Sequence, residues 1–151
     1  MAFAAQASLQ TLHSHLATSG FIPGGVQIGE PKEPVKGIFA AVYMVSASVV
    51  GLFLDGGTEE LHVVNVRLYE DMKAEPQEDI EFRMAKAVSE ITSDFIADYT
   101  LGTEVRHIDI GGINGTPMSA EWGYTDLGGL MYRTVDITVP LTVDDSATAA
   151  P

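Results

Sequence analysis

The stretch from Ala74 to Gly102 constrains the fold most, because its apolar residues recur with the spacing of a helix. Pro76 and the acidic residues around it suit the first turn of a helix, and Gly102 suits a C-terminal cap. Strand-like sequence lies on both sides of this stretch, so we expect a helix over about residues 77–99 that packs across a sheet. Its predicted apolar face consists of Ile80, Met84, Ala87, Val88, Ile91, Phe95 and Tyr99.

The run from Gly37 to Leu54 carries no charged residue and is long enough to raise the question of a transmembrane helix. Its many valines, together with Ser46 and Ser48 near its centre, favour two buried strands that meet at Ser46–Ser48. Both faces of the first strand are apolar, so we expect helices or a neighbouring subunit to cover both of its sides. The residues predicted to form a subunit-interface strand are Phe39, Ala41, Tyr43 and Val45.

The other segments complete an α+β pattern. We expect a shorter N-terminal helix at Ala4–Ser19, an edge strand at Val26–Ile28, a hairpin turn at Asp55–Thr58, and strands at Leu61–Tyr69, Val105–Ile110 and Met131–Val143. Residues 118–129 fit a loop or an irregular strand, and Pro140 predicts a sheet edge or the end of the ladder. The prediction is one domain over residues 1–143, with a mostly antiparallel mixed sheet, and a flexible tail over 144–151.

The charge of the chain limits its partners. Its 151 residues carry 21 acidic and 8 basic side chains, a formal net charge of −13, which disfavours tight binding to nucleic acid. The chain has no cysteine, so thiolate catalysis and cysteine–zinc sites are excluded. Its first basic residue is Lys32, so the N-terminus lacks the charged region of a signal peptide.

No catalytic, cofactor-binding or metal-binding residues are predicted. His13 and His15 stand two apart on a predicted helix and point in different directions, while His62 and His107 fall on different strands. The glycine pairs lack the spacing of a phosphate-binding loop, and no serine has the context of a nucleophile elbow.

Two segments carry a resemblance to a known family. With the helix and short strand between them, HVVNVRLYEDMKAEP at 62–76 and GGLMYRTVDITVPLTVDD at 128–145 resemble tail terminator proteins of siphophages with actinobacterial hosts. The resemblance covers roughly residues 35–145. It implies a structural virion protein without enzymatic activity, assembled in the host cytoplasm, that forms a ring, usually a hexamer, at the head-proximal end of the tail.

Such a ring ends polymerisation of the tail tube and joins the tail to head-completion or connector proteins. DNA passes through its lumen without specific binding, and no membrane is involved. The acidic hairpin residues Asp55, Gly56, Gly57, Glu59 and Glu60 are candidates for a lumen-facing or tube-facing loop, with an ordinary exposed turn as the alternative. Two other functions stay open: another neck or head–tail joining protein, or a small acidic ligand-binding or enzymatic domain.

Overall fold

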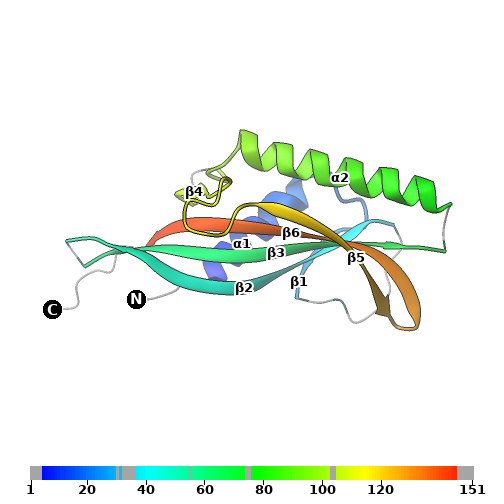
Figure 1. Cartoon of the computed structure of the whole chain (residues 1–151), viewed down its shortest axis with the longest axis horizontal. Helices are drawn as coiled ribbons and strands as arrows, with labels where there is room; N and C mark the ends of the chain where they lie inside the picture. The colour runs from blue at the N-terminus through cyan, green and yellow to red at the C-terminus, as the bar shows by residue number, and fades with distance from the viewer. Residues whose placement is uncertain are drawn as a thin grey trace.

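A computed structural model describes residues 5–29, 31, 37–54, 56–73, 76–102 and 105–145 (Figure 1). Within these ranges, two helices and six strands follow one another. They are α1 (Ala5–Ser19), β1 (Val26–Ile28), β2 (Phe39–Leu52), β3 (Thr58–Asp71), α2 (Gln77–Ala97), β4 (His107–Ile108), β5 (Ser119–Leu127) and β6 (Leu130–Asp145). The predicted α+β fold, with one long and one shorter helix on a mostly antiparallel mixed sheet, is confirmed.

The six strands form one sheet in the order β1-β2-β3-β6-β4, and β5 also pairs with β6. β1 runs parallel to β2, and every other pairing is antiparallel. β4 and β5 lie along the same edge of β6 at different positions, since β5 pairs with β6 up to Thr138 and β4 pairs with Leu141 and Thr142. β2 and β5 are therefore the two long outer strands of the sheet.

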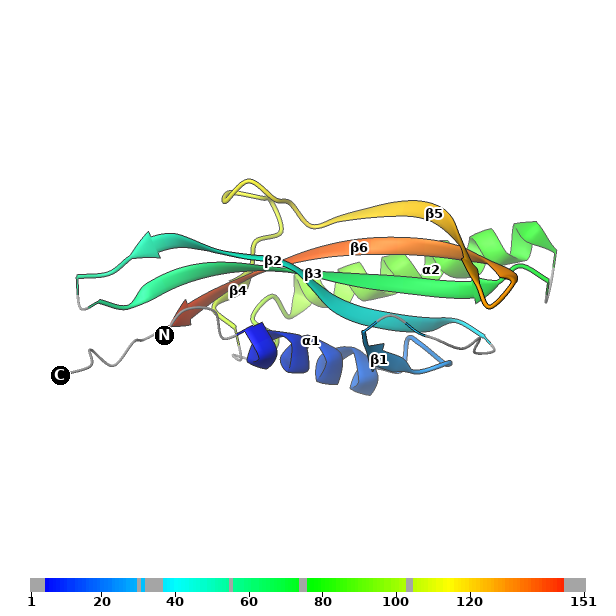
Figure 2. The ribbon, with the colours of Figure 1, turned by 90° about the horizontal axis from the view of Figure 1, so that it is seen from below.

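Both helices pack on one face of this sheet, which we call the helix face (Figures 1 and 2). α2 buries its predicted apolar stripe from Ile80 to Phe95 against β3 and β6, whereas Tyr99 lies beyond the helix end and is half exposed. α1 adds Leu12 and Leu16 over β1 and β2. The side chains beneath them alternate along each strand and are fully buried: Ala40, Val42, Val64, Val66, Leu68, Val135, Ile137, Val139 and Leu141.

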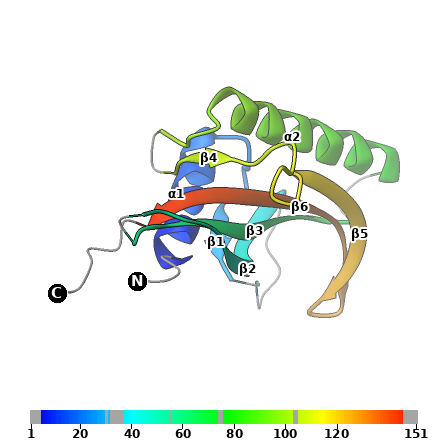
Figure 3. The same cartoon turned by 60° about the vertical axis from the view of Figure 1, so that its left-hand side comes forward.

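The opposite, helix-free face carries a second, smaller cluster. Phe39 stacks on Tyr69 with ring centroids 4.8 Å apart, and Tyr132 meets both rings edge-on. Leu127 and Leu130, at the end of the curved β5–β6 hairpin, pack against this cluster (Figure 3). The apolar residues on both faces of early β2 are thus covered within a single chain.

Three predictions about the sheet are wrong. The run Gly37–Leu54 contains one continuous strand, Phe39–Leu52, and not two, because the expected break near Ser46 is a register shift of one residue and not a turn. Pro140 lies inside the ladder, in the gap where the neighbour of β6 changes from β5 to β4, so its missing N–H leaves no strand unpaired. Asp144 and Asp145 continue β6 opposite Glu59 and Thr58, and the remainder of the predicted tail lies outside the described residues.

No helix in the described part of the chain is long and apolar enough to cross a membrane.

Candidate interaction surfaces

The predicted acidic hairpin loop is shorter and less acidic than the sequence indicated. Asp55 lies outside the described residues, Gly56 is exposed with a φ of 88°, and Gly57 is buried. β3 already begins at Thr58, so Glu59 and Glu60 are strand residues and not loop residues. The interpretation of Glu60 as a lumen-facing acid is wrong, because its side chain is fully buried and accepts a hydrogen bond from Thr58.

Glu60 belongs to a buried polar network that sequence reasoning missed. Its carboxylate lies 2.8 Å from Nε2 of His62, and Nδ1 of His62 lies 2.7 Å from Oγ of Ser8 on α1. The order serine–histidine–carboxylate is that of a hydrolase triad, but all three side chains are buried and none lines the depression of about 540 Å³ beside α1. We assign the network to holding α1 on β3. The i, i+2 spacing of Glu60 and His62 was its only sequence signal.

The predicted subunit-interface strand divides into two parts. Phe39 and Ala41 are buried in their own chain's second cluster and offer no surface to a neighbour, so the prediction is wrong for them. The hydroxyl of Tyr43 accepts a hydrogen bond from Asn65 at 2.7 Å, and this side chain is half buried. Val45 is 60% exposed, and exposed apolar residues continue from it toward the end of the strand.

These residues make the β2–β3 hairpin the most apolar exposed part of the described chain. We call them the apolar hairpin surface: Val45, Val49, Val50, Leu52, Phe53 and Leu54. Leu52 is 78% exposed and Leu54 fully exposed, and Figures 1 and 2 show the hairpin extending beyond both helices. A contiguous apolar surface of this kind typically marks a contact with another protein or with a membrane.

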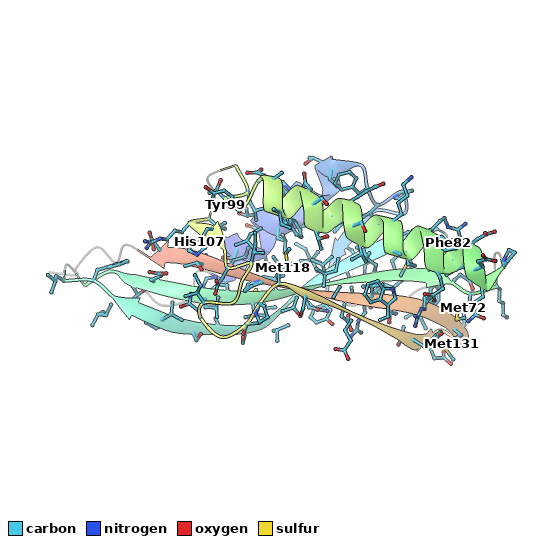
Figure 4. The ribbon with its side chains drawn as sticks, turned by 45° about the horizontal axis from the view of Figure 1, so that its top comes forward. Met72, Phe82, Tyr99, His107, Met118 and Met131 are labelled. Carbon is cyan, nitrogen blue, oxygen red and sulfur yellow. The ribbon has the colours of Figure 1, made fainter. Side chains whose placement is uncertain are left out.

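A second half-exposed apolar surface lies on β5 and the neighbouring part of β6. Trp122, Tyr124 and Met131 are between 40% and 54% exposed, and Arg133 stacks over the Tyr124 ring while its Nε donates to Glu81 of α2 at 2.5 Å. Figure 4 shows Met131 beside Met72 at the end of the sheet opposite the β2–β3 hairpin. The molecule therefore has exposed apolar side chains toward both ends of the sheet.

Ion pairs neutralise most of the described positive charge. Arg67, Arg83, Lys86, Arg106 and Arg133 each lie within ion-pair distance of a carboxylate. The hydrogen bond that Arg67 donates to Asp136, on the helix-free face, raises the pKa of Arg67 above its usual range. Asp144 and then Glu59 raise the pKa of Arg106 in the same way. These guanidinium groups are engaged by carboxylates and present little free positive charge to a phosphate.

The other histidines do not converge on a site. His13 bonds to the Val26 carbonyl, and His15 bonds to Asp94 and so connects α1 with α2. His107 lies on β4. In the described ranges, no group of three or more His, Asp or Glu side chains could hold a metal ion.

The loop between β4 and β5 is held by a buried carboxylate. Both oxygens of Asp109 accept backbone N–H groups, from Ile113 at 3.0 Å and Asn114 at 2.9 Å. This fixed turn presents Ile113, whose side chain is 91% exposed.

Two comparisons with known proteins add no functional information to this geometry. A scan against protein-family models gives no match, and a search of the curated proteins gives none either.

Proposed function

We propose that this chain is a tail terminator of a siphophage, a structural protein that forms a homo-oligomeric ring at the head-proximal end of the tail tube. The observation that carries the proposal is the apolar hairpin surface, which is uncharged on a chain with a net charge of −13. Copies of so acidic a protein approach one another most readily where at least one of the two meeting surfaces is uncharged. A ring of identical subunits places that surface in a contact between neighbours.

The helix-free face suits the wall of a channel for DNA. Asn65 and Asp136 lie on it, and its central cation, Arg67, is hydrogen-bonded to Asp136 at 2.6 Å. Glu121 stands opposite Asp136 on the neighbouring strand and adds negative charge. A face of this kind repels phosphates and lets DNA slide, whereas free lysines or arginines would hold it.

A head–tail joining protein is the second candidate, and the same apolar hairpin surface supports it. An enzymatic function is less well supported, since the Ser8 hydroxyl is buried against His62 and is not open to a substrate. The two assembly roles differ in the partner that the ring binds first, the tail tube or the head connector.

Two measurements test the proposed function. Light scattering of the purified chain should give a closed oligomer, six subunits being the expected number, and not the 16.1 kDa of one chain. Electron microscopy of the chain mixed with isolated tail tubes should then show a ring at one end of each tube. A chain that stays monomeric with and without tubes, or that binds only head connectors, would refute the tail-terminator role.

A further inference from the structure

We propose that the outer edge of β2, residues 44–52, pairs antiparallel with the outer edge of β5, Ser119–Leu127, in a second copy of this chain. The proposal rests on the proposed ring and names the surfaces that close it. It joins one outer edge of the sheet to the opposite outer edge of the next copy, head to tail. Contacts of this type lead to rings or filaments and not to simple dimers.

Both edges are uncovered in the described part of the chain. β1 pairs only with Ala40–Val42 of β2, so beyond Val42 no described strand lies along that edge. β5 pairs with β6 on one side and with no described strand on the other. β2 also lacks the charged residues and prolines with which exposed edges usually avoid such pairing.

The bonds to β1 show which way the backbone groups of β2 point. The N–H of Ala40 donates to the Gly25 carbonyl at 3.0 Å, and the Val42 carbonyl accepts from the Gly29 N–H at 2.9 Å. Because both groups of one strand residue point to the same side, alternate residues from Ala40 onward direct both groups away from β3.

The register shift between Met44 and Ser46 moves this alternation by one residue. After it, Ala47 and Val49 are the residues whose backbone groups point outward. Their cross-strand partners are His62 and Glu60, and His62 bonds to α1, so the side chains of Ala47 and Val49 lie on the helix face.

The same reasoning applies to β5. On β6 the Pro140 carbonyl accepts from the Asp109 N–H, so alternate residues of β6, such as Asp136, point toward β5. The backbone groups of their partners on β5, such as Glu121, point back toward β6. The backbone groups of Trp122 and Tyr124 therefore point to the outer edge, and Trp122, opposite the core residue Val135, has its side chain on the helix face.

The two edges match in hydrogen bonding, in face and in direction. β5 runs antiparallel to β6, and β6 runs in the direction of β2, so joining β5 to β2 of the next copy makes an antiparallel pair. With Ser46–Val49 of β2, the stretch between its two register shifts, placed along β5, Val49 lies opposite Trp122 and Ala47 opposite Tyr124. Both pairs then direct N–H and C=O groups at each other, with apolar side chains on the helix face.

The helix-free side of this contact is also compatible. There, Ser46 and Ser48 of one copy lie opposite Thr125 and Gly123 of the next, all small residues.

Charge favours this pairing over two alternatives. Two β5 edges would bring Glu121 and Asp126 of both copies together, whereas β2 opposes them with uncharged residues. Glu59 and Asp144 share the cation Arg106, so the base of the hairpin keeps a net negative charge, which disfavours an anionic membrane surface as the partner of the same edge.

The absence of cysteine makes a direct test simple. Val49→Cys and Trp122→Cys are combined in the full-length chain, and the protein is treated with a short thiol-to-thiol cross-linker that also reaches diagonal neighbours about 7–8 Å apart. The expected result is a ladder of covalent multimers that ends at the subunit number of the ring. Neither single variant should cross-link, and Val49→Cys combined with Ser93→Cys, on an exposed position of α2, is the matched control.

Each result bears on the proposal separately from the ring. If the wild-type chain is oligomeric but the double variant gives no ladder, the β2–β5 pairing is wrong and the ring stands. Dimers from Val49→Cys alone would mean that two β2 edges meet, which also overturns it. A wild-type chain that stays monomeric with and without tail tubes would refute the proposed function and this inference together. Should Trp122→Cys fail to fold, the pair Ala47→Cys and Tyr124→Cys replaces it with the same expected ladder.

Discussion

The two halves of β2 come from one uncharged run of sequence but lie in opposite environments. In the inner half, Ala40 and Val42 are buried under the helices, and Phe39 and Ala41 under the second cluster. In the outer half, from Val45 onward, the large apolar side chains are between 38% and 78% exposed. The chain's own core explains the composition of the inner half only. The outer half is therefore the part that points to a partner.

The largest effect should come from placing a charge in the inner half. Val42→Asp buries an unpaired carboxylate, which costs several kcal/mol, and should prevent folding. The matched change Val45→Asp, at a position in the outer half that is 60% exposed, should alter the free energy of unfolding by no more than about 0.5 kcal/mol. Chemical denaturation followed by circular dichroism measures both. Equal losses in the two variants would remove the distinction between the halves.

A second variant tests whether the buried network anchors α1 beside the outer half of β2, because His62 on β3 lies opposite Ala47. His62→Ala leaves the buried Glu60 carboxylate and the Ser8 hydroxyl without a shared partner, so we expect a loss of about 1–3 kcal/mol. His107→Ala, on the short strand β4, is the control and should cost less. A thermal unfolding series decides, and no difference between the two variants would mean that the network does not hold α1 on the sheet.

A smaller effect is expected on the helix-free face. Asp136→Asn removes the carboxylate that engages Arg67, and because the pair is partly exposed its loss should cost no more than about 1 kcal/mol. The Arg67 guanidinium, no longer neutralised by Asp136, should make the face bind DNA more strongly, with an affinity that falls as salt rises. Glu121→Gln changes the charge by the same amount without freeing a cation, so it serves as the control in a salt-dependent binding assay. Equal DNA binding by the two variants would show that the Arg67–Asp136 pair does not govern the charge of this face.

The periodic segments were predictable because burial on one face leaves a regular pattern. The apolar stripe of α2 and the alternation of Val64, Val66 and Leu68 in β3 are of this kind. β6 was predicted for the same reason, although Pro140 suggested an edge. The position of Pro140 inside the ladder is explained by the gap between β5 and β4. That gap is a property of the sheet order, which no local sequence pattern predicts.

The candidate surface was only partly predictable. An uncharged run looks the same whether its side chains enter the core or stay outside, so the sequence could not separate Phe39 from Val45. Glu60 was placed in an exposed turn because a buried acid needs a partner, and its partner His62 acts together with Ser8, which lies 54 residues away from that histidine in the chain. Contacts between distant segments decide burial of this kind.

If the outer half of β2 is an assembly surface, a charge placed on its edge should weaken the oligomer. Light scattering across a concentration series compares the oligomer of Val49→Lys with that of Val49→Thr, whose side chain has nearly the same shape as valine. Both variants are expected to keep the fold. Lysine on this edge is expected to raise the dissociation constant of the oligomer at least about tenfold, equivalent to about 1.4 kcal/mol, while threonine leaves the oligomer in place. An oligomer of Val49→Lys as stable as that of the wild-type chain would contradict this assembly role.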